Sequence, residues 1–327
     1  MKTDTTSTTE ILSSSDISRA AELLLQGEIV AFPTETVYGL GACVFLPSAI
    51  EKIFIAKGRP SDNPLIAHIS NLSQLTRIAK NIPDDFFLLY KAFFPGPLTV
   101  VLQKTDEVPS LVSAGLNSIA LRMPSHPLAL ALIEKVGQPL VAPSANISGK
   151  PSSTEFTHVL HDFDGKISAI VNGPSSEIGI ESTVISLLGD IPTILRPGHI
   201  TKDQIQSVLK KTVAIASSDK TDGPVVSPGM KYKHYAPEAR VQLFYAKEDL
   251  LEYLKVTPSV YRMLLASSPL TEIKSCEVFS LSAKTLYAML RKADAEGFSE
   301  VLVYCDEVIM HDRALMNRLS RSAEIHP

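Results

Sequence analysis

The segment DISRAAELLLQGEIVAFPTETVYGLGA, from Asp16 to Ala42, decides the fold of this chain. Asp16 is a typical helix N-cap, the apolar residues after it have helical spacing, and Gly27 ends the pattern. The strand pattern EIVAF (28–32) then leads directly into the loop PTETVYGLGA (33–42). A strand that ends in a loop rich in threonine and glycine is typical of an α/β protein with a ligand site at that strand end.

Helix and strand patterns continue to alternate as far as residue 211, which predicts the α/β class. Residues 214–239 lack sustained periodicity and are interpreted as a linker. The sequence therefore predicts a flexible Ser/Thr-rich tail (1–15), a first domain (16–213), this linker, and a smaller domain with a Rossmann-like rhythm (240–327). In the first domain we expect strands at 28–32, 64–70, 97–103, 118–124, 139–143, 183–188 and 192–197, and helices at 46–58, 83–94, 127–136 and 201–211.

The composition limits the classes of function. The 327 residues include 31 Lys and Arg against 35 Asp and Glu, a net charge of −4, so the chain lacks the basic field of a protein that mainly grips nucleic acid. A small basic patch and a weak RNA contact remain compatible with it. No apolar run approaches the roughly 18 residues that span a bilayer, and the N-terminus has no apolar leader, so we expect a cytoplasmic protein without a membrane partner. Cys43, Cys276 and Cys305 form no CxxC, which argues against disulfides and a cysteine zinc site.

A second loop, KGRPSDNPL (57–65), places Lys57 and Arg59 on either side of Gly58, where a predicted helix ends. Two interpretations stay open. The two cations complement the helix dipole beside a glycine cap. Alternatively, because the following SDNP (61–64) forces another turn, they are held on a stiff loop that suits a polyphosphate.

A third loop, PSANISGKPS (143–152), follows a predicted strand. Its hydroxyl and amide side chains can cradle anionic oxygens, but the same residues also form turn networks without any ligand. Pro151 interrupts the Gly-Lys-Ser/Thr ending of a P-loop, and Gly39-x-Gly41 lacks the third glycine of a dinucleotide motif. The P-loop is therefore rejected, and the dinucleotide motif is only a weak signal. The polar residues concerned are Ser144, Asn146, Ser148 and Ser152.

Other polar residues lie on or beside apolar patterns. Arg122 ends an apolar strand and, if buried, needs either a small-molecule carboxylate or an internal Asp or Glu; Arg196 repeats this pattern. His68, between Ala67 and Ile69, fits a satisfied core histidine, and His158 and His161 have no third ligand for a metal. No nucleophile motif such as GxSxG is present, so covalent catalysis is not indicated.

The motifs, taken in order, resemble the threonylcarbamoyl-AMP synthase family in its two-domain form, from about Asp16 to the C-terminus. The resemblance implies a YrdC-like twisted mixed sheet with helices, followed by a smaller Rossmann-like α/β domain. It also implies condensation of L-threonine, bicarbonate or CO₂, and ATP into threonylcarbamoyl-AMP and pyrophosphate, the first step toward N6-threonylcarbamoyladenosine in tRNA, with a separate tRNA threonylcarbamoyl transferase downstream. The motifs are PTETVYGLGA, AKGRPSDNPLIAHI, FFPGPLTVVL, LRMPSHP, VAPSANISGKPS, ESTVI, LRPGHI, SPGMKYKHYAP and MNRLSRSA.

The resemblance assigns roles to residues. It implies Lys57 and Arg59 as the catalytic charges and Tyr235 as a residue that folds over the nucleotide from a glycine-hinged lid. Mg²⁺ is expected to be held mainly through the phosphates of ATP. The implied threonine set is Thr36, His68, Arg122 and Ser182. The implied ATP set is Lys57, Arg59, Asn63, Ser118, Ser144, Asn146, Ser152, Arg196 and Tyr235.

Two other functions compete with this one. A YrdC-like domain that only binds RNA fits poorly with the net charge of −4 and with the complete set of polar motifs. A carbamoyl-adenylating maturation enzyme with the same domain would be expected to carry zinc fingers, and the sequence has no cysteine array.

Overall fold

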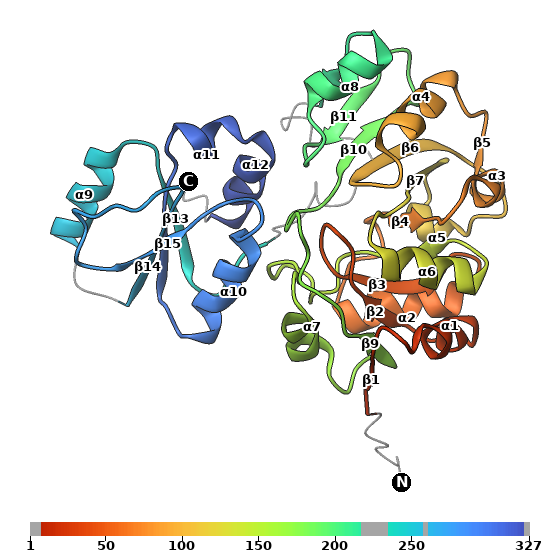
Figure 1. Ribbon diagram of the computed structural model, residues 1–327, viewed down its shortest axis with the longest axis horizontal. Helices are drawn as coiled ribbons and strands as arrows, with labels where there is room; N and C mark the ends of the chain where they lie inside the picture. The colour runs from red at the N-terminus through yellow and green to blue at the C-terminus, as the bar shows by residue number, and fades with distance from the viewer. Residues whose placement is uncertain (1–7, 217–234, 258–260, 324–327) are drawn as a thin grey trace. The chain divides into compact units, whose positions relative to one another are not determined.

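The computed structural model describes residues 8–216, 235–257 and 261–323, and these form two compact units (Figure 1). The first unit contains residues 8–148, 153–177 and 181–216. The second contains 149–152, 178–180 and the described residues from 235 to 323. Each unit has its own sheet, which confirms the predicted α/β class with a second, smaller sheet.

One mixed sheet forms the first unit. Its described strands are β1 (Glu10–Leu12), β2 (Val30–Phe32), β3 (Gly39–Cys43), β4 (Ile66–His68), β5 (Ala79–Lys80), β6 (Leu98–Lys104), β7 (Ser118–Arg122), β8 (Leu140–Val141), β9 (Ala169–Val171), β10 (Thr183–Ser186), β11 (Thr193–Arg196) and β12 (Ala214–Ile215). They follow the order β1-β9-β2-β3-β8-β4-β7-β6-β10-β11-β12, and β5 pairs with β6. Strand β7 is parallel to β4 and antiparallel to β6, and β6 is parallel to β10.

Helices flank this sheet (Figure 1). They are α1 (Ile17–Leu25), α2 (Pro47–Lys57), α3 (Leu75–Ile78), α4 (Asp84–Phe93), α5 (Ser110–Ser113), α6 (Pro127–Val136), α7 (Phe156–Phe163) and α8 (Lys202–Leu209), with a 3₁₀ turn η1 (Leu72–Gln74). Helix α1 packs on α6, and α4 packs on α8. Pro47 begins α2, and Gly58 ends it with a left-handed φ of 59°, so the turn after the helix starts where the sequence predicts.

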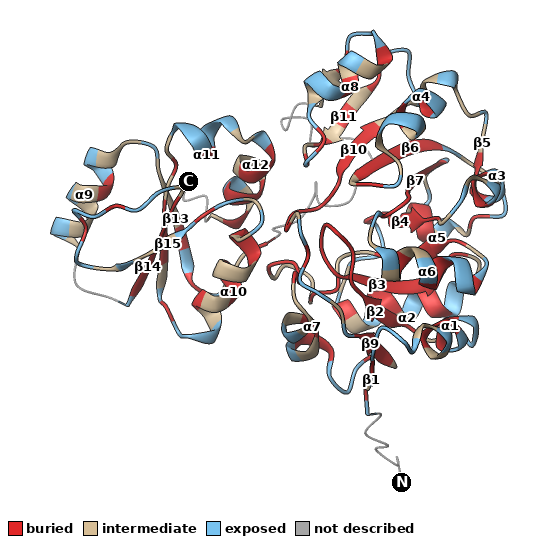
Figure 2. Cartoon of the chain, viewed as in Figure 1, coloured by how far each residue is buried: buried red, intermediate tan, exposed pale blue. Residues whose placement is uncertain are grey.

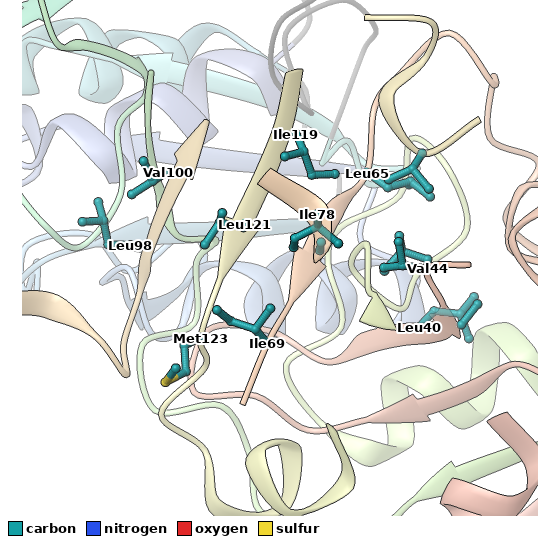
Figure 3. Close-up of a cluster of buried hydrophobic side chains, with 14 of the residues drawn as sticks. Leu40, Val44, Leu65, Ile69, Ile78, Leu98, Val100, Ile119, Leu121 and Met123 are labelled. Atoms are coloured by element: carbon teal, nitrogen blue, oxygen red, sulfur yellow. The ribbon is translucent and has the colours of Figure 1, made fainter. Parts of the chain in front are cut away.

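The central strands are buried on both faces (Figure 2). Alternate residues such as Val100, Ile119 and Leu121 point into the main core of the unit (Figure 3). The residues between them point to the opposite face, as the two-residue period of a strand requires. A smaller apolar cluster lies on that opposite face, consisting of Ile66, Val101, Ala120 and Val184. The candidate site is built beside this small cluster.

The second unit has a four-stranded sheet in the order β13-β16-β14-β15. All its pairs are parallel, in keeping with the Rossmann-like rhythm of the sequence. Its strands are β13 (Arg240–Phe244), β14 (Arg262–Ala266), β15 (Glu277–Ser280) and β16 (Glu300–Tyr304), and its helices are α9 (Lys247–Val256), α10 (Leu286–Ala295), α11 (Glu307–His311) and α12 (Arg313–Ser322).

The structure corrects one end of the predicted organisation. Residues 10–12 were expected in a flexible tail, but they form β1, which pairs in parallel with β9. The Thr9 hydroxyl donates to the carbonyl of Ile167 over 2.8 Å and so fixes this edge strand. At the other end, β12 at 214–215 pairs with β11, within the stretch interpreted as a linker. Residues 217–234 of that stretch lie outside the described residues.

Candidate active site

Two of the three loops that the sequence singles out meet in the first unit. The backbone N–H of Leu40 donates to the carbonyl of Pro143 over 2.8 Å. The N–H of Ala145 in turn donates to the carbonyl of Tyr38 over 2.7 Å. The PTETVYGLGA loop and the start of the PSANISGKPS loop are therefore joined as neighbouring backbone segments.

Lys57 ties the remaining loop to these two. Its ammonium group donates to the carbonyls of Ser144 and Asn146, each over 2.5 Å, and the side chain is buried. The backbone N–H of Ser148 donates back to the carbonyl of Lys57 over 2.8 Å. The three loops thus converge, and Lys57 is a structural tie between two of them; its expected role toward phosphate stays a prediction.

Three buried side chains form a row across neighbouring strands beside these loops. His68 on β4, Arg122 on β7 and Thr99 on β6 are aligned in register, so their side chains share one face of the sheet. All three are almost fully buried, with exposed fractions of 3%, 4% and 0%. We call these three residues the polar row.

Arg122 links the polar row to the PTETVYGLGA loop. Its Nη2 donates to Glu35 Oε1 over 2.5 Å, its Nη1 donates to Thr36 Oγ1 over 2.8 Å, and its Nε donates to the carbonyl of Gly96 over 3.2 Å. Glu35 is thus the internal carboxylate that the sequence left as one of two alternatives for Arg122. These bonds use three of the five N–H groups of the guanidinium, and within the described residues the other two are left for a ligand.

The electrostatics of the row follow from its burial. Burial, together with the charge of the nearby Arg122, lowers the pKa of His68 to about 3, so His68 is neutral at ordinary pH. His68 Nδ1 lies 3.2 Å from the carbonyl of Ile66; as the donor in this contact, it leaves Nε2 as an acceptor. Burial alone would raise the pKa of Glu35, but the Arg122 guanidinium outweighs it and holds the pKa below its usual value. The row therefore contains one cation and a neutral imidazole, and the anion that pairs with the cation is Glu35 of the neighbouring loop.

The Thr36 hydroxyl has a defined direction. The Thr34 hydroxyl lies 2.6 Å from the carbonyl of Val37 and donates to it, so its oxygen accepts from Thr36 over 2.9 Å. Thr36 therefore gives its own proton to Thr34, and its oxygen faces Arg122 as an acceptor. This chain of bonds orients the loop before any substrate arrives.

Ser182 extends the row toward β10. Its hydroxyl lies 2.7 Å from that of Thr99, and Arg196 donates to its carbonyl from Nε and Nη2 over 3.2 and 3.0 Å. Gly198 is required at the next turn, because a Cβ there would lie 2.3 Å from the backbone nitrogen of Thr183. The turn after β11 can approach Ser182 only without a side chain at this position.

The turn at the end of α2, residues 57–63, contains a buried side chain without partners in the described structure. We call it the KGR turn. Arg59 Nη2 donates to the carbonyls of Asn63 and Pro64 over 3.3 and 3.1 Å, so the guanidinium braces its own turn. Asn63 is 1% exposed, yet neither its amide nitrogen nor its amide oxygen has a hydrogen-bond partner in the described structure. A buried amide without partners marks a place where a ligand or water completes the structure.

Comparison with known proteins shows the family to which the chain belongs. A family model described as Telomere recombination (Sua5_yciO_yrdC) matches residues 22–198, and one described as Threonylcarbamoyl-AMP synthase, C-terminal domain, matches residues 200–324. Threonylcarbamoyl-AMP synthase from Pyrococcus abyssi is 42% identical over 93% of both chains, and that from Bacillus subtilis is 51% identical over 75% of this chain and 72% of its own. The chain belongs to the threonylcarbamoyl-AMP synthase family.

Solved structures agree with this membership. Sua5 from Pyrococcus abyssi complexed with L-threonine matches with a TM-score of 0.87 and 38% identity, over 97% of this chain and all of that one. A histidine-and-tyrosine double-alanine variant of the same protein matches with a TM-score of 0.88 and 39% identity, over 96% of both chains. The two-domain form that the sequence motifs indicate is therefore confirmed, and its domain boundaries stay a prediction.

The second unit of this family member holds two of the expected ATP residues. Ser152 is fully buried. Tyr235 is 6% exposed and has a left-handed φ of 68°; its ring lies 5.3 Å from that of Tyr287 and 5.8 Å from the guanidinium carbon of Arg318. The neighbours Tyr232 and His234 lie outside the described residues. The role of Tyr235 toward a nucleotide stays a prediction.

Glu35 and Thr99 are members of the site that the motifs did not single out. Thr99 interrupts an otherwise apolar strand, LTVVL, and a buried threonine in such a run is the signal that was available. Glu35 lies between two threonines of the first loop, but its pairing with Arg122 depends on tertiary structure. Ser118, on the same face of β7 as Arg122, is 8% exposed.

The described residues contain no group of three His, Cys, Asp or Glu side chains placed to hold a metal ion. His161 is exposed, as expected for a surface residue. No described helix is both long enough and apolar enough to cross a membrane.

Proposed function

We propose that the chain is an L-threonylcarbamoyladenylate synthase, a nucleotidyltransferase that joins L-threonine, bicarbonate or CO₂, and ATP into threonylcarbamoyl-AMP and pyrophosphate. The observation that carries this proposal is Arg122, a buried guanidinium with two N–H groups left for a carboxylate, held between Glu35 and Thr36 beside His68. Such a site suits a small amino acid. The names of the relatives and the L-threonine in one similar structure support the choice of substrate.

The residues then have distinct tasks. Arg122 binds the carboxylate of threonine, and Thr36, Ser182 and the acceptor nitrogen of His68 face its polar atoms. Arg59 and Asn63 meet ATP, and Lys57 holds their turn against the PSANISGKPS loop. Arg196 and Ser182 connect the proposed ATP site with the proposed threonine site, since Arg196 donates to the hydroxyl of Ser182.

The chemistry requires positioning more than a nucleophilic side chain. The threonine amine, after its ammonium form has lost a proton to water, attacks CO₂ and releases a second proton to give a carbamate. The carbamate oxygen then attacks the α-phosphorus of ATP, the bond from that phosphorus to the bridging β-phosphate oxygen breaks, and pyrophosphate leaves. A carbamate is short-lived in water, so the site must form it and use it without release. The cations near the phosphates stabilise the charge that develops there.

Mg²⁺ would enter with the nucleotide. Because the described residues offer no cluster of metal ligands, the phosphate oxygens and water would supply its coordination. When bound, the ion would neutralise phosphate charge, and we assign no protein ligand to it. We further propose that the protein is cytoplasmic and that a tRNA threonylcarbamoyl transferase uses its product downstream. Any contact with RNA is expected to be weak. Tyr235→Ala is expected to weaken the retention of ATP.

The test is the product. The purified chain with ATP, bicarbonate and L-threonine should release pyrophosphate only when all three are present, and mass spectrometry should detect threonylcarbamoyl-AMP. Arg59→Ala should abolish most of this release, whereas Arg77→Ala, which alters an exposed arginine, should not. Pyrophosphate release that needs no amino acid would favour a carbamoyl-adenylating enzyme. RNA binding with no adenylate would favour a binding module.

A further inference from the structure

Glu35 presents an unsatisfied oxygen within the amino-acid site. The side chains of Arg122 and Glu35 are 5% and 6% exposed, so the ion pair is removed from water. Glu35 Oε1 accepts from Arg122, but no donor among the described residues reaches Oε2 with hydrogen-bond geometry. The backbone N–H groups of Glu35 and Ser125 lie near enough only to help keep the pKa of the carboxyl low. A buried carboxylate oxygen without a donor is costly, which indicates that a donor from outside belongs there.

The neighbouring groups define what that donor is. Glu35 stays ionised because the Arg122 guanidinium holds its pKa down. His68 is neutral and so brings no second positive charge to compete for the carboxylate. Thr36 gives its proton to Thr34 and has none to offer Glu35. The free oxygen of Glu35 therefore faces a place where a cationic donor is favoured and no group among the described residues supplies one.

An α-amino acid carries this donor next to the group that Arg122 takes. Its ammonium and carboxylate are attached to the same carbon atom, with opposite charges. Arg122 and Glu35 present opposite charges over 2.5 Å, in the complementary order. We propose that Glu35 Oε2 binds the α-ammonium group of the amino-acid substrate while Arg122 binds its carboxylate. This inference rests on the proposed function and assigns Glu35 as the residue that selects zwitterionic amino acids over hydroxy acids.

The alternative is that Glu35 only orients Arg122. In that case, a substitution of Glu35 weakens the binding of every ligand that contacts the Arg122 guanidinium, whether or not the ligand has an amino group. If Glu35 meets the ammonium, the loss is confined to ligands that carry one. Two ligands that differ only in this group separate the two roles.

The experiment measures binding by calorimetry for L-threonine and (R)-3-hydroxybutyrate, which is threonine without its amino group. Wild type should bind threonine about 10- to 100-fold more tightly, the scale of a hydrogen bond to a charged group. Glu35→Gln keeps an oxygen for Arg122 but removes the charge, so the preference should fall to within about threefold. Glu107→Gln, at an exposed glutamate, serves as the matched control and should keep the full preference.

Two results would overturn the inference. Equal weakening of both ligands by Glu35→Gln would reduce Glu35 to a positioning residue for Arg122 and overturn the inference. Equal binding of both ligands to wild type would overturn it without any variant. If Glu35→Gln does not fold, Glu35→Asp keeps the charge on a shorter side chain and should weaken threonine more than the hydroxy acid. Failure of wild type to bind threonine at all would instead reject the proposed function.

Discussion

The polar row and the KGR turn hold their buried polar side chains in different ways. In the polar row, strands aligned in register hold His68, Arg122 and Thr99, and each has a protein hydrogen bond. In the KGR turn, Arg59 braces its own loop while the buried amide of Asn63 has no partner in the described structure. The side chains of the row are held by the protein itself, whereas the turn contains a buried amide that we propose is completed by the nucleotide.

This difference follows from the elements that carry each region. A strand in the middle of a sheet has its backbone fixed by two neighbours, so side chains on it keep their directions without further help. A loop has no such constraint, and Lys57 must hold the turn by donating to two carbonyls of another loop. The amino-acid site is therefore expected to be rigid, and the nucleotide site to depend on a tie that can be removed by mutation.

Arg122→Ala should have the largest effect of all single changes. It removes the proposed hydrogen-bond donor to the substrate carboxylate. It also leaves the charge of Glu35 buried and uncompensated, which should lower the free energy of unfolding by about 3–5 kcal/mol. Denaturant unfolding and threonine binding would measure both losses. The double variant Arg122→Ala, Glu35→Gln should regain most of the free energy of unfolding that Arg122→Ala loses, but it should not regain threonine binding. A stable Arg122→Ala variant would show that the row is not the fixed element that we describe.

The two cations of the KGR turn should behave differently from each other. Lys57→Ala and Arg59→Ala should each reduce adenylate synthesis by at least ~100-fold, the scale of a lost charge contact in a transition state. Lys57→Ala should also lower the free energy of unfolding more than Arg59→Ala does, because it leaves two carbonyls without their donor and one of these bonds is fully buried. Pyrophosphate release and denaturant unfolding separate the two outcomes. Near-normal turnover in either folded variant would contradict its role at the phosphates.

The neutral His68 predicts an acid sensitivity for the row. Its pKa is lowered to about 3 in the folded protein, while an unfolded histidine titrates near 6.5. The stability that this difference contributes is present above pH 6.5 and is lost as the pH falls from 6.5 toward 3. Between pH 7 and pH 4.5 the loss should be about 2–3 kcal/mol. His68→Gln should remove this part of the pH dependence, and an unchanged slope would show that His68 is not buried in its neutral form.

The sequence predicted most of the elements that carry the site. Strands 64–70, 97–103 and 118–124 were expected from apolar patterns beside prolines. Strands β4 and β7 lie within the first and the last of these ranges, and β6 extends one residue beyond the second. Helix 46–58 was equally clear, because Pro47 and Gly58 mark its ends. These local signals were enough to place the loops at the ends of buried strands.

The partners within the site could not be predicted in the same way. Arg122 was left between an internal and an external carboxylate because the pairing with Glu35 joins residues 87 positions apart. Thr99 was placed in a strand, but its place in the polar row depends on register, which no local pattern fixes. Tail residues 10–12 were missed because an edge strand of three residues has little pattern of its own.

Asn63→Ala gives the smallest and most specific effect. It should weaken ATP binding about 10-fold and leave threonine binding unchanged, since in our proposal the amide contacts only the nucleotide. The free energy of unfolding should stay constant or rise by up to about 1 kcal/mol, because two buried atoms without partners are removed. Gln74→Ala is the matched control, because its buried amide oxygen accepts from the backbone N–H of Ser70 over 2.9 Å and its loss should cost about 1 kcal/mol. If both variants lose the same stability, the amide of Asn63 is satisfied without nucleotide, and the turn is as complete before binding as the polar row.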